Sequence, residues 1–240
     1  MQFGLVLPRG TDLSVPADVD YLEPDIARFL EPQLPNDKHD VPPLPKTPIR
    51  ALHSLIPASL PITGPHADLS ALRLHVQRAC ERAAQLGVRV ITLSSPDALG
   101  FPEGYDPKQA KSQVLDFLRT ALPFFARHEI MLVAGVNPPD RCNVMTTLPE
   151  VLQYVWQIDH PWFQCLLDTR LLGSGNITPE QFYDGLPWIR HVYVGGSVPG
   201  LSTVFAALKR AKYDDLISMT ETHSDLSESL RSVRQTWSAV

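Results

Sequence analysis

The sequence predicts a single α/β domain over residues 1–240, in which eight parallel strands form a (β/α)8 barrel. Short apolar segments alternate with amphipathic segments almost from end to end, which is typical of repeated βα units around a parallel sheet. Residues 163–168 are largely apolar and end in the carboxylate of Asp168, as expected for a strand that stops at a barrel mouth. The 240 residues, 44% of them hydrophobic, suffice for one large core, although length alone also allows two small domains.

The predicted strands share short length, apolar or β-branched composition and flanking turn residues. In chain order they are Gln2–Leu7, Asp20–Glu23, Ile49–Ile56, Val88–Leu93, Ile130–Val136, Trp162–Asp168, His191–Val194 and Asp215–Met219.

Helical periodicity is clearest over Ser70–Leu86, where Asp68 is placed to cap the first turn and Gly87 to end the last. A second helix is predicted over Lys108–His128, in which Pro123 predicts a kink or an earlier end. The later units are completed by predicted helices over Leu201–Lys212 and Ser224–Trp237.

The segment Pro32–Pro48 interrupts this alternation. It holds six prolines among seventeen residues and a polar stretch, which exclude a regular helix. We expect an extended loop in place of one helix of the ring, or a mobile lid, and the sequence does not separate the two.

Composition narrows the classes of partner. The net charge is −5 and no cluster of basic residues is visible, which argues against binding to nucleic acid. Cys80, Cys142 and Cys165 have no metal-binding or disulfide spacing. The N-terminus has no signal-peptide pattern and no segment approaches the length of a membrane span. We therefore expect a cytoplasmic protein with a small-molecule partner, and a homo-oligomer is compatible with these features.

Several motifs occur in the order found in one known family. The sequence resembles the sugar phosphate isomerase/epimerase family of xylose isomerase-like TIM barrels, from about Phe3 to about Glu221 and most clearly in its C-terminal half. The resemblance rests on several short motifs rather than on one strong motif. They are residues 83–91 (AAQLGVRVI), 148–152 (LPEVL), 165–169 (CLLDT), 189–194 (IRHVYV) and 206–214 (AALKRAKYD).

The resemblance implies a divalent metal, such as Mn, Mg, Co or Zn, bound at strand ends. Its ligands would be a Glu after strand five, an Asp after strand six, a His or Gln in strand seven and a Glu at strand eight. At the matching positions this sequence has Ala134, Asp168, Tyr193 and Thr220. Only Asp168 keeps the expected ligand, so the sequence predicts a degenerate metal site.

A shifted metal site is an alternative. A bulge near the end of strand eight would turn Glu221 or His223 toward the mouth, beside Asp168 and His191. These four residues are the weak metal candidates. This alternative requires several side chains to point to the opposite side of the strand from the one that strand alternation predicts.

The predicted catalytic residues are Asp168, as base or residual ligand, and its partner Glu221. Asp168 has a structural alternative, in which it accepts N–H bonds from the loop that follows and fixes Thr169 or Arg170. His191 is more typical of a hydrogen-bonded interior histidine than of a ligand. The candidates for binding substrate are Asn137, Arg170, His191, Tyr193, Gly195, Gly196 and Ser197.

Glu23 ends the second strand and is a further carboxylate that could reach the mouth, whereas His53 is expected in the core or at the rim. Residues 195–197 (GGS) could expose backbone N–H groups to a phosphate, although an ordinary turn is the slightly favoured reading of them.

Two functions remain open from sequence. One is an isomerase or epimerase that acts on a small sugar, sugar phosphate or polyol by proton transfer next to a carbonyl. The other is a barrel that binds a carbohydrate-like ligand or a partner without catalysis. A metal-free epimerase is a third possibility, and its proton exchange would ignore chelators. The endonuclease branch of the superfamily is disfavoured because the sequence offers neither a multi-metal cluster nor a basic face.

Overall fold

The computed structural model describes residues 1–8, 18–39, 43–174, 176–195, 200–220 and 226–240. The described residues form eight parallel strands with helices on the outside, as the sequence predicts. The strands are β1 (Gln2–Leu7), β2 (Tyr21–Pro24), β3 (Ala51–Leu52), β4 (Val90–Thr92), β5 (Met131–Ala134), β6 (Phe163–Asp168), β7 (Ile189–Val194) and β8 (Leu216–Met219).

The sheet closes into a barrel. Its strand order is β2-β1-β8-β7-β6-β5-β4-β3, so that only β2 and β3 must meet to complete the ring. They do so through two parallel bridges, Leu22 with Ile49 and Asp25 with His53. The backbone N–H of Leu22 donates to the carbonyl of Pro48 at 2.9 Å and that of His53 to the carbonyl of Pro24 at 3.1 Å. The barrel therefore has a mouth at the C-terminal ends of its strands.

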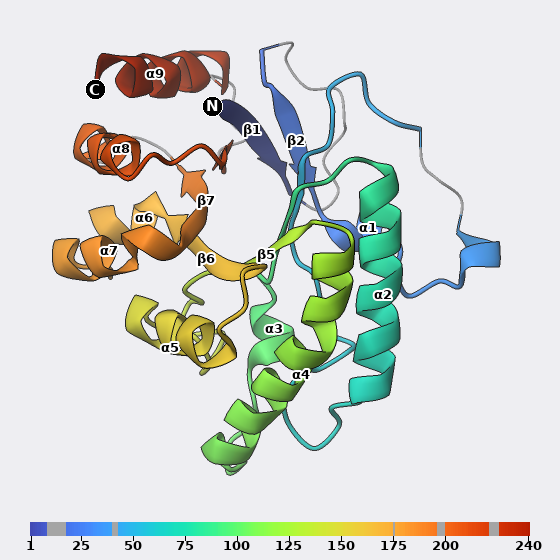
Figure 1. The fold of residues 1–240 in the computed structure, drawn as a ribbon. Helices are drawn as coiled ribbons and strands as arrows, with labels where there is room; N and C mark the ends of the chain where they lie inside the picture. Colours follow the sequence, from blue (N-terminus) through green and yellow to red (C-terminus); the bar gives the residue numbers. More distant parts are fainter. Residues whose placement is uncertain (9–17, 40–42, 175, 196–199, 221–225) are drawn as a thin grey trace.

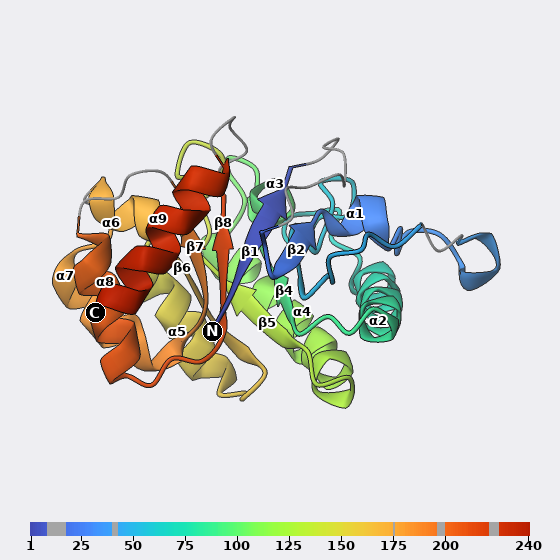
Figure 2. The ribbon, with the colours of Figure 1, turned by 90° about the horizontal axis from the view of Figure 1, so that it is seen from above.

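Helices surround the barrel and alternate with the strands along most of the chain (Figures 1 and 2). The long helices α2 and α4 lie next to each other on one side, and α8 packs beside α9 on the other. The helices are α1 (Ile26–Phe29), α2 (Leu69–Gln85), α3 (Pro96–Leu99), α4 (Pro107–Arg127), α5 (Leu148–Ile158), α6 (Thr169–Gly173), α7 (Pro179–Gly185), α8 (Leu201–Arg210) and α9 (Leu226–Ala239), with 3-10 turns at Asn36–Lys38 and Leu186–Trp188.

Strand alternation divides the core into two layers. The larger layer lies between strands and helices, and it includes Leu132 and Ala134 of β5. The smaller layer fills the barrel interior, and its members come from alternate positions of the strands. They are Tyr21, Ala51, Val90, Val133, Leu166, Tyr193 and Leu216.

The two long helices follow the sequence closely. The side chain of Asp68 accepts hydrogen bonds from the N–H groups of Ser70 and Ala71, at 2.9 and 3.0 Å, which confirms the predicted cap of α2. Helix α4 continues through Pro123 to Arg127, so the predicted earlier end is wrong. The buried apolar face of α4 extends past the proline, and this packing offsets the hydrogen bond that proline cannot donate.

The proline-rich segment forms no α-helix in its described residues, as predicted, and contains only the short turn Asn36–Lys38. Arg82 of α2 fixes the chain just before and at the start of this segment. Its guanidinium donates to the carbonyls of Leu30, Glu31 and Leu34 at 2.6 to 2.7 Å, and to the side-chain oxygen of Asn36 at 2.9 Å. Residues 40–42 lie outside the described part of the chain.

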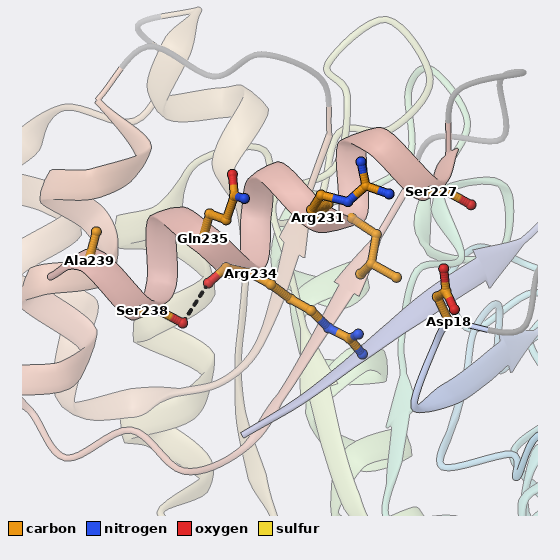
Figure 3. Close-up of a pocket in the computed structure, with 8 residues that line it drawn as sticks. Asp18, Ser227, Arg231, Arg234, Gln235, Ser238 and Ala239 are labelled. Carbon is orange, nitrogen blue, oxygen red and sulfur yellow. Dashed lines mark hydrogen bonds between the residues drawn. The ribbon is translucent and has the colours of Figure 1, made fainter.

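A hollow of about 480 Å³ lies on the outer surface beside α9 (Figure 3). Arg234 extends from the helix toward β1 and pairs with Asp20 at 2.9 Å. This hollow is formed by one helix and its neighbours and does not involve the C-terminal ends of the strands. No helix in the described part of the chain is long and apolar enough to cross a membrane.

Candidate functional site at the barrel mouth

A fully buried carboxylate lies inside the barrel. Glu23 of β2 receives hydrogen bonds on both oxygens, from Tyr193 at 2.5 Å on Oε1 and from His191 at 2.9 Å and Ser218 at 2.5 Å on Oε2. The hydroxyl of Tyr21 lies 2.6 Å from that of Ser218 and completes the chain of contacts. Glu23, His191, Ser218 and Tyr21 are each 0% exposed. Together with Tyr193, these residues form a group of five that we call the interior network.

The surroundings of Glu23 favour its ionised form despite its burial. Burial raises the pKa of Glu23, but the facing imidazole of His191, with the hydrogen bonds from His191 and Ser218, outweighs burial and leaves the pKa below its usual value. The other ring nitrogen of His191 faces the carbonyl of Leu216 at 3.1 Å. Both ring nitrogens of His191 therefore face oxygen atoms of the protein.

Tyr193 keeps its proton. Burial, followed by the nearby charge of Glu23 and the hydrogen bond to it, raises the pKa of Tyr193 well above its usual value. Its hydroxyl donates to Glu23, and its ring fills the interior beside Leu166. His191 and Tyr193, both candidates for binding substrate, are therefore engaged within the barrel.

Asp168 lies at the end of β6 and forms an ion pair with Arg170. The guanidinium Nη2 is 2.6 Å from Oδ2, and Nε lies 2.9 Å from Oδ1 and 3.2 Å from Oδ2. Oδ1 also accepts the backbone N–H of Arg170 at 3.0 Å and caps α6. Asp168 therefore accepts a backbone N–H bond and fixes Arg170, as its structural alternative predicts. Its side chain is 18% exposed and that of Arg170 is 54% exposed, so the pair remains accessible from solvent.

Gly195, directly after β7, lies against the side chain of Arg170. A Cβ at this position would stand 2.6 Å from Cδ of Arg170 and 2.6 Å from Oγ1 of Thr220, which follows β8. Such distances are too short for real atoms, so any other residue here would require the side chain of Arg170 or Thr220 to shift. The ends of β6, β7 and β8 therefore meet around Arg170.

The strand-five register differs by one residue from the sequence prediction. Ala134, predicted at the position of a ligand Glu, packs outward with Leu132 in the layer between strands and helices. Gly135 takes the inward position, because a Cβ there would meet Leu166, which lies in the barrel interior. The placement of Ala134 is therefore wrong, and the residue at the inward position again has no side chain that binds metal.

The described residues do not fit a divalent cation at the mouth. The four corresponding positions hold Gly135, Asp168, Tyr193 and Thr220. Among them only Asp168 has a carboxyl group, and a guanidinium already lies 2.6 Å from it. Tyr193 remains a phenol, a poor ligand. Nowhere in the described residues do three His, Cys, Asp or Glu side chains group together as a metal site would require.

Other predicted site residues have different surroundings. Asn137 is buried, and its side-chain amide donates to the carbonyl of Val144 at 3.0 Å, so it fixes the loop after β5. His53 is half-buried, and its Nε2 lies 3.0 Å from the carbonyl of Leu7. The remaining candidates lie outside the described residues, and they are Gly196, Ser197, Glu221 and His223.

The interior network was not predicted as a unit, although three of its members, Glu23, His191 and Tyr193, were named as candidates. Tyr21 and Glu23 are two residues apart on β2, as are His191 and Tyr193 on β7, and this spacing places each pair on one face. This two-residue spacing could have indicated that each pair points into the barrel together. Asp25 was also missed. It is buried at the end of β2, where its side chain accepts the N–H of Ala27 at 3.0 Å.

The fold and mouth define a (β/α)8 barrel with polar side chains at the C-terminal ends of its strands. A family model described as "Xylose isomerase-like TIM barrel" matches residues 44–236. The chain therefore belongs to the xylose isomerase-like TIM barrel family. A search of curated proteins found no match.

Solved structures of low sequence identity share this fold. The 3-keto-D-glucoside 4-epimerase YcjR from E. coli is 14% identical, with a TM-score of 0.70 and full coverage of both chains. A D-allulose 3-epimerase from Methylomonas sp. in complex with D-allulose is 18% identical, with a TM-score of 0.71, covering 99% of this chain and 90% of that one. The IOLI protein with a bound zinc atom is 13% identical, with a TM-score of 0.67 and coverages of 98% and 96%.

Proposed function

We propose that this protein binds a small sugar, sugar phosphate or polyol at the mouth of the barrel and moves a proton at the carbon next to a carbonyl. The observation that carries the proposal is the accessible carboxylate of Asp168 at the end of β6, held beside the guanidinium of Arg170. Sugar epimerases among the solved structures with this fold support the ligand class. The proposal assigns no step to a metal, because the described donor set does not fit one.

The chemistry balances without a co-reactant. The carboxylate of Asp168 takes the proton from the substrate carbon, and the electrons of the broken C–H bond move to the carbonyl oxygen to give an enediolate. Return of a proton to the same carbon, from the other face, restores the carbonyl and gives the epimer. Its return to the former carbonyl carbon gives the isomer, provided that the hydroxyl proton on the first carbon passes to the old carbonyl oxygen. Glu221, predicted as the partner of Asp168, is proposed as the group that returns the proton.

Exchange of substrate hydrogen with solvent tests the proposal. D-fructose, D-allulose and D-fructose 6-phosphate incubated with the protein in D2O and EDTA should gain deuterium beside the carbonyl, measured by NMR. Asp168→Asn should slow this exchange by roughly 10²- to 10⁴-fold, the range for loss of a general base. The matched control is Asp97→Asn, because Asp97 also pairs with an arginine, Arg141 at 2.7 Å. No exchange with any of these compounds contradicts the proposal.

A second candidate function is binding of the same ligands without catalysis. It is favoured by one observation, that both oxygens of Asp168 already accept hydrogen bonds from Arg170. It predicts saturable binding of these sugars by calorimetry with no deuterium gained. Binding and exchange together would exclude it.

A further inference from the structure

The side chain of Arg170 has a defined place at the mouth although it is 54% exposed. Two of its nitrogens, Nε and Nη2, contact both oxygens of Asp168 at 2.6 to 3.2 Å. A planar guanidinium held by two parallel contacts loses less conformational freedom on binding a further group than a flexible ammonium would. Asp168 therefore orients the positive charge as well as balancing it.

Gly195 supplies the space that this arrangement needs. The stem of Arg170 crosses the end of β7 where a Cβ on residue 195 would lie 2.6 Å from Cδ and 3.1 Å from Cγ. Thr220 borders the same space, with its Oγ1 2.6 Å from that Cβ position. Any side chain at residue 195 would thus displace the side chain of Arg170 or that of Thr220, and the glycine leaves room for the guanidinium beside the carboxylate.

We infer that Arg170 is the cation that binds the substrate's oxygen atoms at this mouth, in the role for which the resemblance implies a divalent metal. The inference deepens the proposed function and rests on it for the ligand class. The other positions that would supply metal ligands hold Gly135, Tyr193 and Thr220, which are neutral. The guanidinium stands 2.6 Å from Asp168, the one carboxylate that those positions retain.

The substrate class follows from the shape of the guanidinium. Besides the Nε and Nη2 edge that faces Asp168, a guanidinium has a second planar edge of N–H groups. Such an edge matches two neighbouring oxygens in one plane, as in the carbonyl and adjacent hydroxyl of an open-chain α-hydroxy ketone or aldehyde. Negative charge develops on the carbonyl oxygen when the carbon loses its proton, and a preorganised cation stabilises that charge more than it stabilises the substrate. Arg170 would therefore favour compounds that mimic the planar enediolate over the sugars themselves.

A sugar hydroxamate is the suitable probe because its two oxygens are planar and adjacent. With EDTA present, the wild-type protein should bind D-erythronohydroxamate measurably by calorimetry. Arg170→Gln should weaken binding by about 10- to 100-fold, the effect of losing one charge-assisted hydrogen bond, and Arg170→Lys should weaken it less. The matched control is Arg119→Gln on α4, which removes a similarly exposed cation paired with Asp116 and should leave binding unchanged.

Gly195→Ala provides a second variant, since it displaces Arg170 without removing the charge. It should reduce hydroxamate binding about as much as Arg170→Gln, while circular dichroism shows both variants folded. No binding by the wild type, or binding by Arg170→Gln within twofold of the wild type, would overturn the inference. Binding that is lost in EDTA and restored by Mn²⁺ would overturn it as well.

The two proposals fail in different ways. Hydroxamate binding that depends on Arg170, without deuterium exchange in any sugar, supports the cation role and removes proton transfer. Exchange that survives in Arg170→Gln at the wild-type rate supports proton transfer and removes the cation role.

Discussion

The interior network and the mouth pair each place a carboxylate against a nitrogen-bearing side chain, but in opposite surroundings. Glu23 and His191 lie inside the barrel at 0% exposure, 2.9 Å apart, with every oxygen and ring nitrogen bonded within the protein. Asp168 and Arg170 lie 2.6 Å apart at the mouth, and Arg170 is 54% exposed. A buried pair without its partner is costly, whereas an exposed pair contributes little to folding. The interior network therefore serves stability, and the mouth pair is the one for which a role in ligand binding is proposed.

Removing the buried carboxylate should have the largest effect on stability. Glu23→Gln replaces one acceptor oxygen by an NH2 group, so at least one of the donors from Tyr193, His191 and Ser218 then faces another donor. We expect the free energy of unfolding to fall by roughly 3–5 kcal/mol, the cost of breaking a buried pair. Urea unfolding measures it.

The control for this variant is Glu103→Gln, since Glu103 is exposed in a turn. It should change the free energy of unfolding by less than about 0.5 kcal/mol. Equal losses in the two variants would mean that the Glu23 contacts add nothing to stability and would remove the contrast between interior and mouth.

The second-largest expected effect is a loss of stability in acid, through protonation of Glu23 in the interior network. The pKa of Glu23 in the folded protein lies below its usual value because the facing His191 and the hydrogen bonds outweigh burial. A group with a lowered pKa stabilises the fold above its unfolded pKa, about 4.3 for Glu, and this contribution disappears as the pH falls through the folded pKa. The melting temperature should therefore fall from about pH 5 downward.

The same acid titration in Glu23→Gln isolates this contribution. The variant should start less stable and lose stability less steeply below about pH 5, because the titrating group is gone. Parallel curves for the two proteins would show that the ionised Glu23 does not provide the acid-sensitive part of stability.

Tyr193→Phe should cost less than the loss of the carboxylate. It keeps the ring beside Leu166 and removes the hydroxyl that donates to Glu23 at 2.5 Å. A hydrogen bond to a charged group contributes about 1.5–3 kcal/mol, and we expect a loss of unfolding free energy within that range. The matched control is Tyr183→Phe, because Tyr183 is 49% exposed on α7. A loss as small as that of the control would place Tyr193 outside the stabilising network.

Features that depend on nearby residues could be predicted from the sequence, whereas strand register and long-range contacts could not. Helix α2 was placed to within a residue because its cap and periodicity are local. The register of β5 was missed by one residue, since residues 130–136 are apolar on both faces of a strand that is buried on both sides. With no alternation of polarity, Ala134 and Gly135 could not be told apart.

The pairing of Glu23 with His191 depends on the closed barrel. The two residues are separated by 168 positions, and they meet only because β2 and β7 face each other across the interior. The sequence of each strand predicts which face Glu23 and His191 occupy. It does not predict which residue of a distant strand each of them contacts. The contact of Asp168 with Arg170, two residues apart, was within reach of sequence reasoning and was left as an alternative.

Asp168→Asn should have the smallest effect on folding, and it tests the mouth side of the comparison. Asparagine also caps helices well, so the bond from the N–H of Arg170 survives, while the ion pair is lost. Because Arg170 is largely exposed, we expect the free energy of unfolding to fall by no more than about 1 kcal/mol, measured by urea unfolding. A loss as large as that of Glu23→Gln would mean that the mouth pair is a structural element like the interior network. A small loss would leave Asp168 and Arg170 with no substantial role in folding, which is the condition that a pair kept for binding a ligand must meet.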